Sequence, residues 1–268
     1  MNRYKFWQAP FFAFFSKDFY ASVGKHWRGL ALGYLLFLLA IAWLPSVLKI
    51  NQIISKFENE FLADIIDKVP EMEINDGKLI TSVKMPYIMD LKDNEPFVVI
   101  DTNATVSDYD QYKRPLLITK DEIIFKRSKS DTRIISFKEM PNFYLDGVAV
   151  DNFSNKVLSI AKILLYPLLV LNSFFARIFQ AMILAVIGLI FASSLNTEIG
   201  YSNLMRLAIV AMTPIIILRT IVFYFSINIP FFWLIGMIMT LVYLFIAVSA
   251  YEEEDLERNL ADLEADPY

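Results

Sequence analysis

The side chains that could do chemistry are few and scattered. Val98–Thr102 is an apolar run that ends in an Asp-Thr pair, the arrangement that delivers a catalytic carboxylate in aspartic proteases. That reaction needs two carboxylates that share one proton. Asn103 stands where the glycine of such a motif usually follows, and no second such motif exists. The favoured interpretation of Asp101 is therefore a strand-ending turn, in which its carboxylate accepts hydrogen bonds from nearby backbone N–H groups.

Other kinds of catalysis lack the residues that they need. The chain has one histidine, His26, within a basic cluster, and it has no cysteine. The HExxH, GxSxG, P-loop and GxGxxG patterns are absent. We therefore expect no enzyme, no cofactor and no metal site, and an outward-facing hydrolase based on Asp101 is the weakest alternative.

Two arginines, Arg177 and Arg219, lie within apolar stretches that contain no Asp or Glu. An arginine at the centre of a bilayer costs on the order of 2.5 to 3.5 kcal/mol, and less near its edge. Both residues are about 10 to 12 Å from the expected outer ends of their helices, at 1.5 Å per residue. Either both side chains extend to the lipid phosphates, or the pair, together with Asn172 or Asn228, forms an outward-facing cavity for an anionic headgroup or solute.

The elements that must position these residues are four apolar stretches in a one-plus-three arrangement. They are Gly29–Leu48, Lys162–Ser193, Leu207–Ile227 and Pro230–Ala250. About 20 apolar residues cross a hydrocarbon core of ~30 Å. The hydrophobic share of 56% also exceeds the ~45–50% of soluble proteins. The predicted fold is a membrane α-helical protein with about four transmembrane helices and an inserted extracytoplasmic α+β domain, which consists of a helix and a small antiparallel sheet.

Charge predicts the orientation of the chain. Residues 1–28 hold five Lys or Arg against one acidic residue, whereas residues 251–268 hold one against eight. Basic residues beside a membrane-spanning helix mark the cytoplasmic side, so the insert lies outside and both termini lie inside. The predicted parts are a cytoplasmic interfacial segment (1–28), transmembrane helix 1 (29–48), the extracytoplasmic domain (49–156), an interfacial lead-in with transmembrane helices 2 to 4 (157–250) and an acidic cytoplasmic tail (251–268).

Two interpretations of residues 157–194 are compatible with the sequence: one membrane span or two. The favoured interpretation is one span over about 170–193, with a lead-in that is hinged near Pro167.

The insert begins with an amphipathic helix over Ser46–Val69. Short strands follow, and the expected ranges are Met72–Ile74, Lys78–Val83, Phe97–Asp101, Leu116–Thr119, Glu122–Arg127 and Thr132–Phe137. The longest irregular connection is expected to be a contact loop, with candidate residues Asp101, Asp108, Tyr109, Asp110 and Tyr112.

Small residues predict where helices pack closely. Gly29 and Gly33 form a GxxxG pattern in the first apolar stretch. A second stripe lies on one face of the next helix and consists of Ala181, Ala185, Gly188 and Ala192. Such stripes let helix backbones approach one another, either within one chain or between two copies. Pro214 is expected to kink the third helix.

Both ends of the chain are expected at the inner membrane surface. The aromatic segment Tyr4–Tyr20 is predicted to lie along the inner leaflet. The tail has Leu256, Leu260 and Leu263 at helical spacing among acidic residues. It either docks on a basic cytoplasmic partner or is a solvated and partly disordered end.

A resemblance rests on a set of short motifs. They are Phe14-Phe15, Asp76-Gly77, Pro86, Ile100-Asp101-Thr102, Leu116–Lys126 and Thr213-Pro214. Together they resemble the bacterial membrane-protein family called domain of unknown function 1189, over about Phe11 to Ala250. The resemblance implies a multi-pass protein of the bacterial cytoplasmic (inner) membrane and gives no activity.

The expected function is that of a non-enzymatic accessory or sensor protein, which acts through its external domain and through membrane contacts. The alternative is a small transporter or anionic-lipid-binding protein that uses the arginine pair. Expected partners are membrane lipids, a membrane or extracytoplasmic protein or a second copy of the chain, and not nucleic acid.

Overall fold

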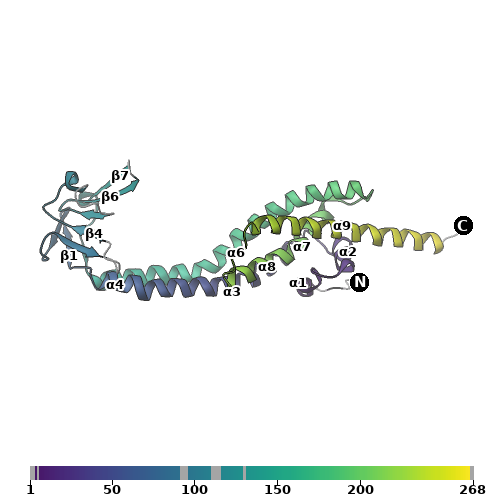
Figure 1. Ribbon diagram of the computed structural model, residues 1–268, viewed down its shortest axis with the longest axis horizontal. Coiled ribbons are helices and arrows are strands. Elements are labelled where there is room, and N and C mark those ends of the chain that lie inside the picture. The colour runs from purple at the N-terminus through teal and green to yellow at the C-terminus, as the bar shows by residue number, and fades with distance from the viewer. Residues whose placement is uncertain (1–3, 5, 91–95, 110–115, 129–130, 266–268) are drawn as a thin grey trace. The chain divides into compact units, whose positions relative to one another are not determined.

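The computed structural model describes residues 4, 6–90, 96–109, 116–128 and 131–265. The chain divides into two compact units (Figure 1). The helical unit consists of Met1–Ile50 and Leu164–Tyr268, and the mixed unit consists of Asn51–Ile163.

Helices make up most of the described part of the helical unit. They are η1 (Phe6–Gln8), α1 (Ala9–Phe12), α2 (Lys17–His26), α3 (Leu32–Phe57), α6 (Gly147–Ser194), α7 (Tyr201–Ala211), α8 (Thr213–Tyr224) and α9 (Phe232–Ala265). Two of them, α3 and α6, continue into the mixed unit. Within the described residues, four helical stretches are long and apolar enough to cross a membrane: Leu32–Ile66, Gly147–Ser194, Tyr201–Tyr224 and Phe232–Leu256. The four long apolar helices and the one-plus-three order therefore agree with the sequence.

Residues 157–194, for which one span or two remained open, lie in a single helix. α6 runs without interruption over 48 residues and passes through Pro167. The third stretch, by contrast, is interrupted. α7 ends at Ala211 and α8 begins at Thr213, so the break lies at Met212, just before Pro214. Pro214 lacks the backbone N–H that a continuous helix would use, which favours a break at this position, although α6 continues through Pro167.

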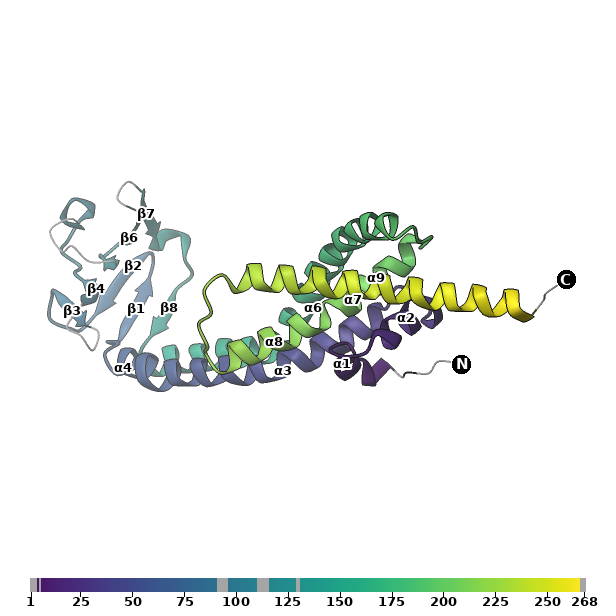
Figure 2. The ribbon, with the colours of Figure 1, turned by 45° about the vertical axis from the view of Figure 1, so that its right-hand side comes forward.

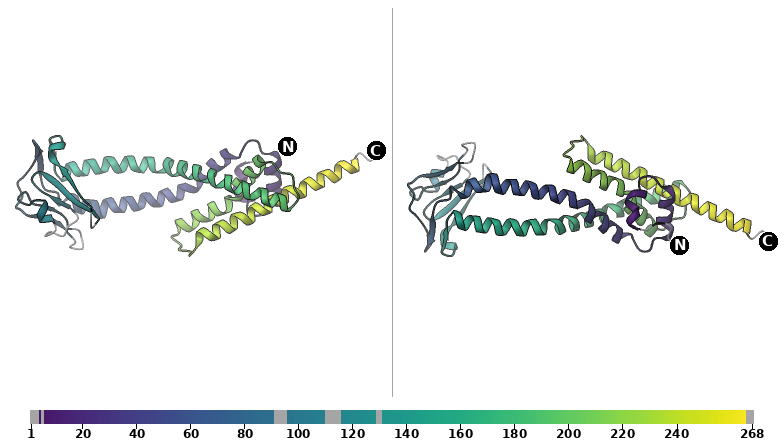
Figure 3. Two further views of the ribbon diagram at one scale, coloured as in Figure 1. Left: turned by 90° about the horizontal axis from the view of Figure 1, so that it is seen from above. Right: turned by 90° about the horizontal axis from the view of Figure 1, so that it is seen from below.

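Two helix boundaries differ from the expectation. The amphipathic helix of the insert is continuous with α3, through a π-helical turn, η2 (Glu58–Leu62), and α4 (Ala63–Ile66). The tail is not a disordered end as far as Ala265, because α9 continues through the acidic residues (Figure 3).

α7 forms the centre of the helical unit. Eight consecutive residues, from Leu204 to Ala211, are buried, and α7 packs against both α2 and α9. α2 is buried from Phe19 to Gly24. The predicted interfacial segment is therefore split: Phe11 and Phe15 are 67% and 78% exposed, whereas Phe19 lies in the core. Burial against α7 and α9 removes more apolar surface from water than a position beside the bundle would.

The mixed unit contains two sheets (Figure 2). The first has the order β2-β1-β8 and the second has the order β3-β4-β5-β6-β7. The strands are β1 (Met72–Asn75), β2 (Lys78–Thr81), β3 (Tyr87–Asp90), β4 (Pro96–Ile100), β5 (Leu116–Ile118), β6 (Glu122–Ser128), β7 (Asp131–Ser136) and β8 (Phe143–Leu145). The pairs are antiparallel except for β4 and β5, which are parallel. Six strands agree with the predicted ranges within a few residues, and β3 and β8 were missed.

Alternation along β4 places side chains on both faces of the larger sheet. Val98 and Ile100 belong to a core that also includes residues of the smaller sheet, such as Met72 and Ile74. Val99 belongs to a second core with Leu117, Ile124 and Tyr109. The larger sheet is therefore covered on both faces around β4 and β5, whereas Ile134 and Ile135 of β7 are exposed.

Candidate functional site

Arg177 on α6 and Arg219 on α8 line one cavity of about 560 Å³. The helices α3, α6 and α8 of the helical unit form its walls. Its other polar lining residues are Ser46, Asn172, Ser173, Gln180 and Thr220. Arg177 is half-buried, whereas Arg219 and Asn172 are exposed, so the cavity is accessible from outside the bundle.

The two guanidinium groups carry the charge of this cavity. No other lining residue is charged, and no carboxylate among the described residues forms an ion pair with either arginine. The Arg177 guanidinium donates a hydrogen bond to the side-chain oxygen of Gln180, one turn further along α6. Two like charges that share a cavity repel each other, most strongly where water is excluded. The arrangement therefore favours an anion between them.

The two arginines lie at a similar height in the helical unit. Arg177 lies about 26 Å along α6 from its end at Ser194. Arg219 lies about 27 Å along α7 and α8 from the start at Tyr201. These two helix ends are joined by the short 195–200 connection, so the two arginines lie at a similar distance along their helices from that connection and line the same cavity.

Polar contacts hold the walls of the cavity together. Trp43 Nε1 on α3 donates to Ser173 Oγ on α6 at 2.8 Å, and the Tyr166 hydroxyl donates to the Ala40 carbonyl at 2.9 Å. Lys49 Nζ on α3 donates to the carbonyls of Phe223 and Tyr224 at 2.9 and 2.8 Å. Those carbonyls belong to the last turn of α8, where a cation is favoured by the helix dipole. α3 is thereby tied to both of the helices that carry the arginines.

The structure brings together three of the four predicted ligand-binding residues. Asn172 lines the cavity with the two arginines, whereas Asn228 lies in the turn after α8 and is not among the lining residues. Gln180 was missed, although it follows Arg177 by three residues and therefore lies on the same helix face. The lining serine and threonine residues give no signal in the sequence, because such residues are common in helices of every kind.

Two of the predicted contact-loop residues, Asp101 and Tyr109, are buried, whereas Asn103, Thr105, Val106 and Ser107 in the same loop are exposed. Asp101 is buried and its carboxylate accepts from the Asn103 N–H at 2.9 Å, which confirms the predicted turn. Tyr109 is buried in the second core of the mixed unit. Asp108 accepts from the backbone N–H and the hydroxyl of Thr105 at 2.8 and 2.9 Å, and these bonds lower the pKa of its carboxyl group.

Asp110 and Tyr112 lie outside the described residues.

The two stripes of small residues differ in their surroundings. Ala181, Ala185 and Ala192 belong to the core of the helical unit, and a Cβ at Gly188 would lie 3.0 Å from Leu204 Cδ2. This stripe therefore packs within one chain. Gly29 has φ +69° and precedes α3, and a Cβ on it or on Gly33 would meet no atom within 4 Å. The GxxxG pair makes no close packing contact within the described part of this chain.

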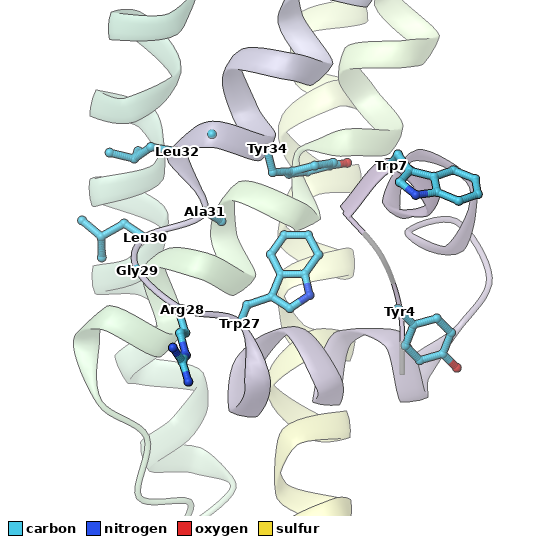
Figure 4. Close-up of a pocket in the computed structure, with 10 residues that line it drawn as sticks. Tyr4, Trp7, Trp27, Arg28, Gly29, Leu30, Ala31, Leu32 and Tyr34 are labelled. Atoms are coloured by element: carbon cyan, nitrogen blue, oxygen red, sulfur yellow. The ribbon is translucent and has the colours of Figure 1, made fainter. Parts of the chain in front are cut away.

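A second cavity, of about 700 Å³, lies at the start of α3 (Figure 4). Tyr4, Trp7 and residues 27–34 line it, and Arg28 is the charged residue among them. The Trp27 and Tyr34 rings meet edge to face with centroids 5.5 Å apart. Arg28 extends away from these rings (Figure 4). Four aromatic residues and five aliphatic or glycine residues line this cavity, and it lacks the paired cations of the first one.

Arg206, which stands just before the apolar stretch Leu207–Ile227 in the sequence, is buried in α7. Arg206 donates to the carbonyls of Gly24 and Gly29 at 2.7 and 3.1 Å and to Asn203 Oδ1 at 2.6 Å. The Gly24 carbonyl belongs to the last turn of α2, so Arg206 caps that helix. The bonded carbonyls explain why this buried cation is tolerated.

The acidic tail contacts the chain's own basic segment. Lys17 pairs with Glu253 at 3.3 Å and Lys25 pairs with Asp255 at 3.2 Å, which joins α2 to α9 (Figure 1). Lys25 also lies over the Tyr251 ring, 5.0 Å from its centroid. The opposite charges at the two ends of the sequence are thus partly paired with each other.

Comparison with known proteins gives one match. The model of the family described as "Protein of unknown function (DUF1189)" matches residues 7–248. The resemblance that the sequence motifs indicated is therefore confirmed over most of the chain. No curated protein and no solved structure matches. Among the described residues, no group of three His, Cys, Asp or Glu side chains is placed to hold a metal ion.

Proposed function

We propose that this chain, which belongs to the DUF1189 family, is an integral protein of the bacterial cytoplasmic membrane that binds an anionic lipid headgroup between Arg177 and Arg219. It acts there as a non-enzymatic accessory or sensor protein. The observation that carries the proposal is the pairing of two arginines in one cavity that has no acidic lining residue.

The proposed topology has four spans, with both termini in the cytoplasm and the mixed unit outside. The four long apolar helices support the number of spans. Lys17, Lys25 and Arg28 precede the first of these helices, and the preference of basic residues for the cytoplasmic side supports the orientation. The arginines, about 26 and 27 Å from the inner helix ends, then lie near the outer edge of a hydrocarbon core of ~30 Å.

Binding of a headgroup explains this cavity better than separate extension of the two side chains. Arginines that reach the bilayer surface independently have no need of a common cavity. Here Asn172, Gln180 and Ser173 add hydrogen-bonding groups beside the two guanidinium groups. Because Arg219 and Asn172 are exposed on the bundle surface, a lipid can enter from the bilayer without any opening of the bundle.

Lipid retention tests the proposal. The protein is purified in a mild detergent from bacterial membranes, and bound phospholipid is counted by native mass spectrometry. Arg177→Gln combined with Arg219→Gln is compared with Arg133→Gln combined with Lys156→Gln, which removes two exposed charges from the mixed unit. We expect the first pair to lose one bound anionic lipid and the control pair to keep it. Equal retention by the two variants would refute the binding site.

The orientation has a separate test. Because the chain has no cysteine, a single cysteine at Asp76 reports its own accessibility. We expect a membrane-impermeant thiol reagent to label Asp76→Cys in intact cells from which the outer membrane has been removed. Labelling only after lysis would place the mixed unit in the cytoplasm.

A further inference from the structure

The charge of the cavity indicates the charge of its ligand. We propose, on the basis of the proposed function, that the site selects a headgroup with two negative charges on a terminal phosphate over one with a single phosphodiester charge. The preferred ligand class is therefore a lipid phosphate monoester or a lipid diphosphate.

The first argument is charge balance. The charged groups that face the cavity are Arg177 from α6 and Arg219 from α8, and none comes from α3. The ammonium group of Lys49, on α3, donates hydrogen bonds to the carbonyls at the end of α8. No Asp, Glu or His lines the cavity. A phosphodiester would neutralise one guanidinium and leave the other without a counter-charge where water is partly excluded, which is unfavourable.

The second argument is the number of acceptor atoms. A guanidinium group presents a planar fork of N–H donors that binds phosphate oxygens in pairs. A terminal phosphate offers three such oxygens, whereas a phosphodiester offers only two that are not bridging. One Arg177 donor is already used by Gln180. Three terminal oxygens can therefore satisfy both forks together, and two oxygens cannot do so as completely.

The third argument is size and lining. The volume of about 560 Å³ lies within the ~300–1,000 Å³ typical of small-molecule sites. Leu39, Leu169, Ile216 and Phe223 supply apolar surface beside the polar groups. A phosphate together with the adjoining apolar part of a lipid fits both kinds of lining.

The experiment compares two lipids with the same acyl chains. Phosphatidic acid is a phosphate monoester and phosphatidylglycerol is a phosphodiester. Native mass spectrometry of the purified full-length protein with an equal mixture of the two is expected to show phosphatidic acid bound more tightly by about tenfold, which corresponds to ~1.4 kcal/mol. This preference should rise between pH 5 and pH 8, because the second proton of a phosphate monoester leaves near pH ~6.

Variants test whether the preference for phosphatidic acid depends on the two arginines. Arg219→Gln leaves one cation, so both lipids should bind alike, whereas Arg219→Lys keeps the charge and should keep a preference. Arg133→Gln, in the mixed unit, should behave like the original protein. Thermal unfolding of each variant shows whether it is folded.

Two outcomes overturn the inference and leave the proposed function intact. In the first, the original protein binds both lipids equally, and Arg177→Gln combined with Arg219→Gln loses both. In the second, the preference for phosphatidic acid persists in Arg219→Gln. Failure of the original protein to bind either lipid through the two arginines overturns both proposals.

Discussion

Replacement of Gly24 by alanine should weaken the contact between α2 and α9. A Cβ on Gly24 would lie 2.5 Å from Cδ2 of Tyr251 and 3.1 Å from its Cε2. The ring cannot turn aside freely, because Lys25 lies over its face and Asn203 Nδ2 donates to its hydroxyl at 3.2 Å. The new methyl group therefore forces either the ring or the helix to move.

The expected magnitude follows from two opposing effects. Overpacking of a close contact costs about 1–3 kcal/mol, whereas alanine gains about 1 kcal/mol over glycine within a helix. Gly33→Ala, in α3, is the matched control, because its Cβ would meet no atom within 4 Å. The free energy of unfolding of Gly24→Ala should therefore be lower than that of Gly33→Ala by about 1–3 kcal/mol.

Equilibrium unfolding in mixed detergent micelles, followed by tryptophan fluorescence, measures this difference. In a Tyr251→Ala background the ring is gone, so Gly24→Ala should cost much less, as expected for residues in contact. Equal stability of Gly24→Ala and Gly33→Ala would refute the proposed packing of α2 on α9.

Three further outcomes are expected. Arg206→Met should lower the free energy of unfolding by about 1–3 kcal/mol for each of the two backbone carbonyls that lose their donor, as measured in the same unfolding assay; unchanged stability would contradict the capping role. Asp255→Asn should speed amide hydrogen exchange in the last turns of α9, because the pair with Lys25 is lost, and added salt should affect the variant less than the original protein. The pKa of Asp108 is lowered from 3.8 by its bonds from Thr105, so this stabilisation is present above the unfolded pKa and is lost as pH falls through the folded value. The protection of the Thr105 amide, measured relative to the intrinsic exchange rate at each pH, should therefore fall at acid pH, and Asp108→Asn should abolish that change.

Elements that depend on local pattern could be predicted from the sequence. The long apolar stretches and the alternating segments gave the four helices and six of the strands, because periodicity reflects burial directly. β3 (Tyr87–Asp90) and β8 (Phe143–Leu145) were missed, although they are no shorter than β1, β2 and β5, which were predicted; length alone therefore does not explain the difference. The parallel pairing of β4 with β5 depends on the path of the intervening connection, which no local pattern specifies.

The site was predicted only in part, because it depends on how helices pack. The two arginines could be identified by their apolar surroundings, but their meeting in one cavity depends on the packing of α6, α8 and α3. Arg206 and Gly24 were missed for a related reason. In the sequence Arg206 resembles an ordinary basic residue of a loop, and only the fold places it against the carbonyls of α2.

A structure determined experimentally in a bilayer that contains phosphatidic acid tests the central claim most directly. We predict phosphate density within hydrogen-bonding distance of both the Arg177 and Arg219 guanidinium groups, in the cavity between α3, α6 and α8. Guanidinium groups that extend separately to different lipids at the bilayer surface, with no density between them, would contradict the account.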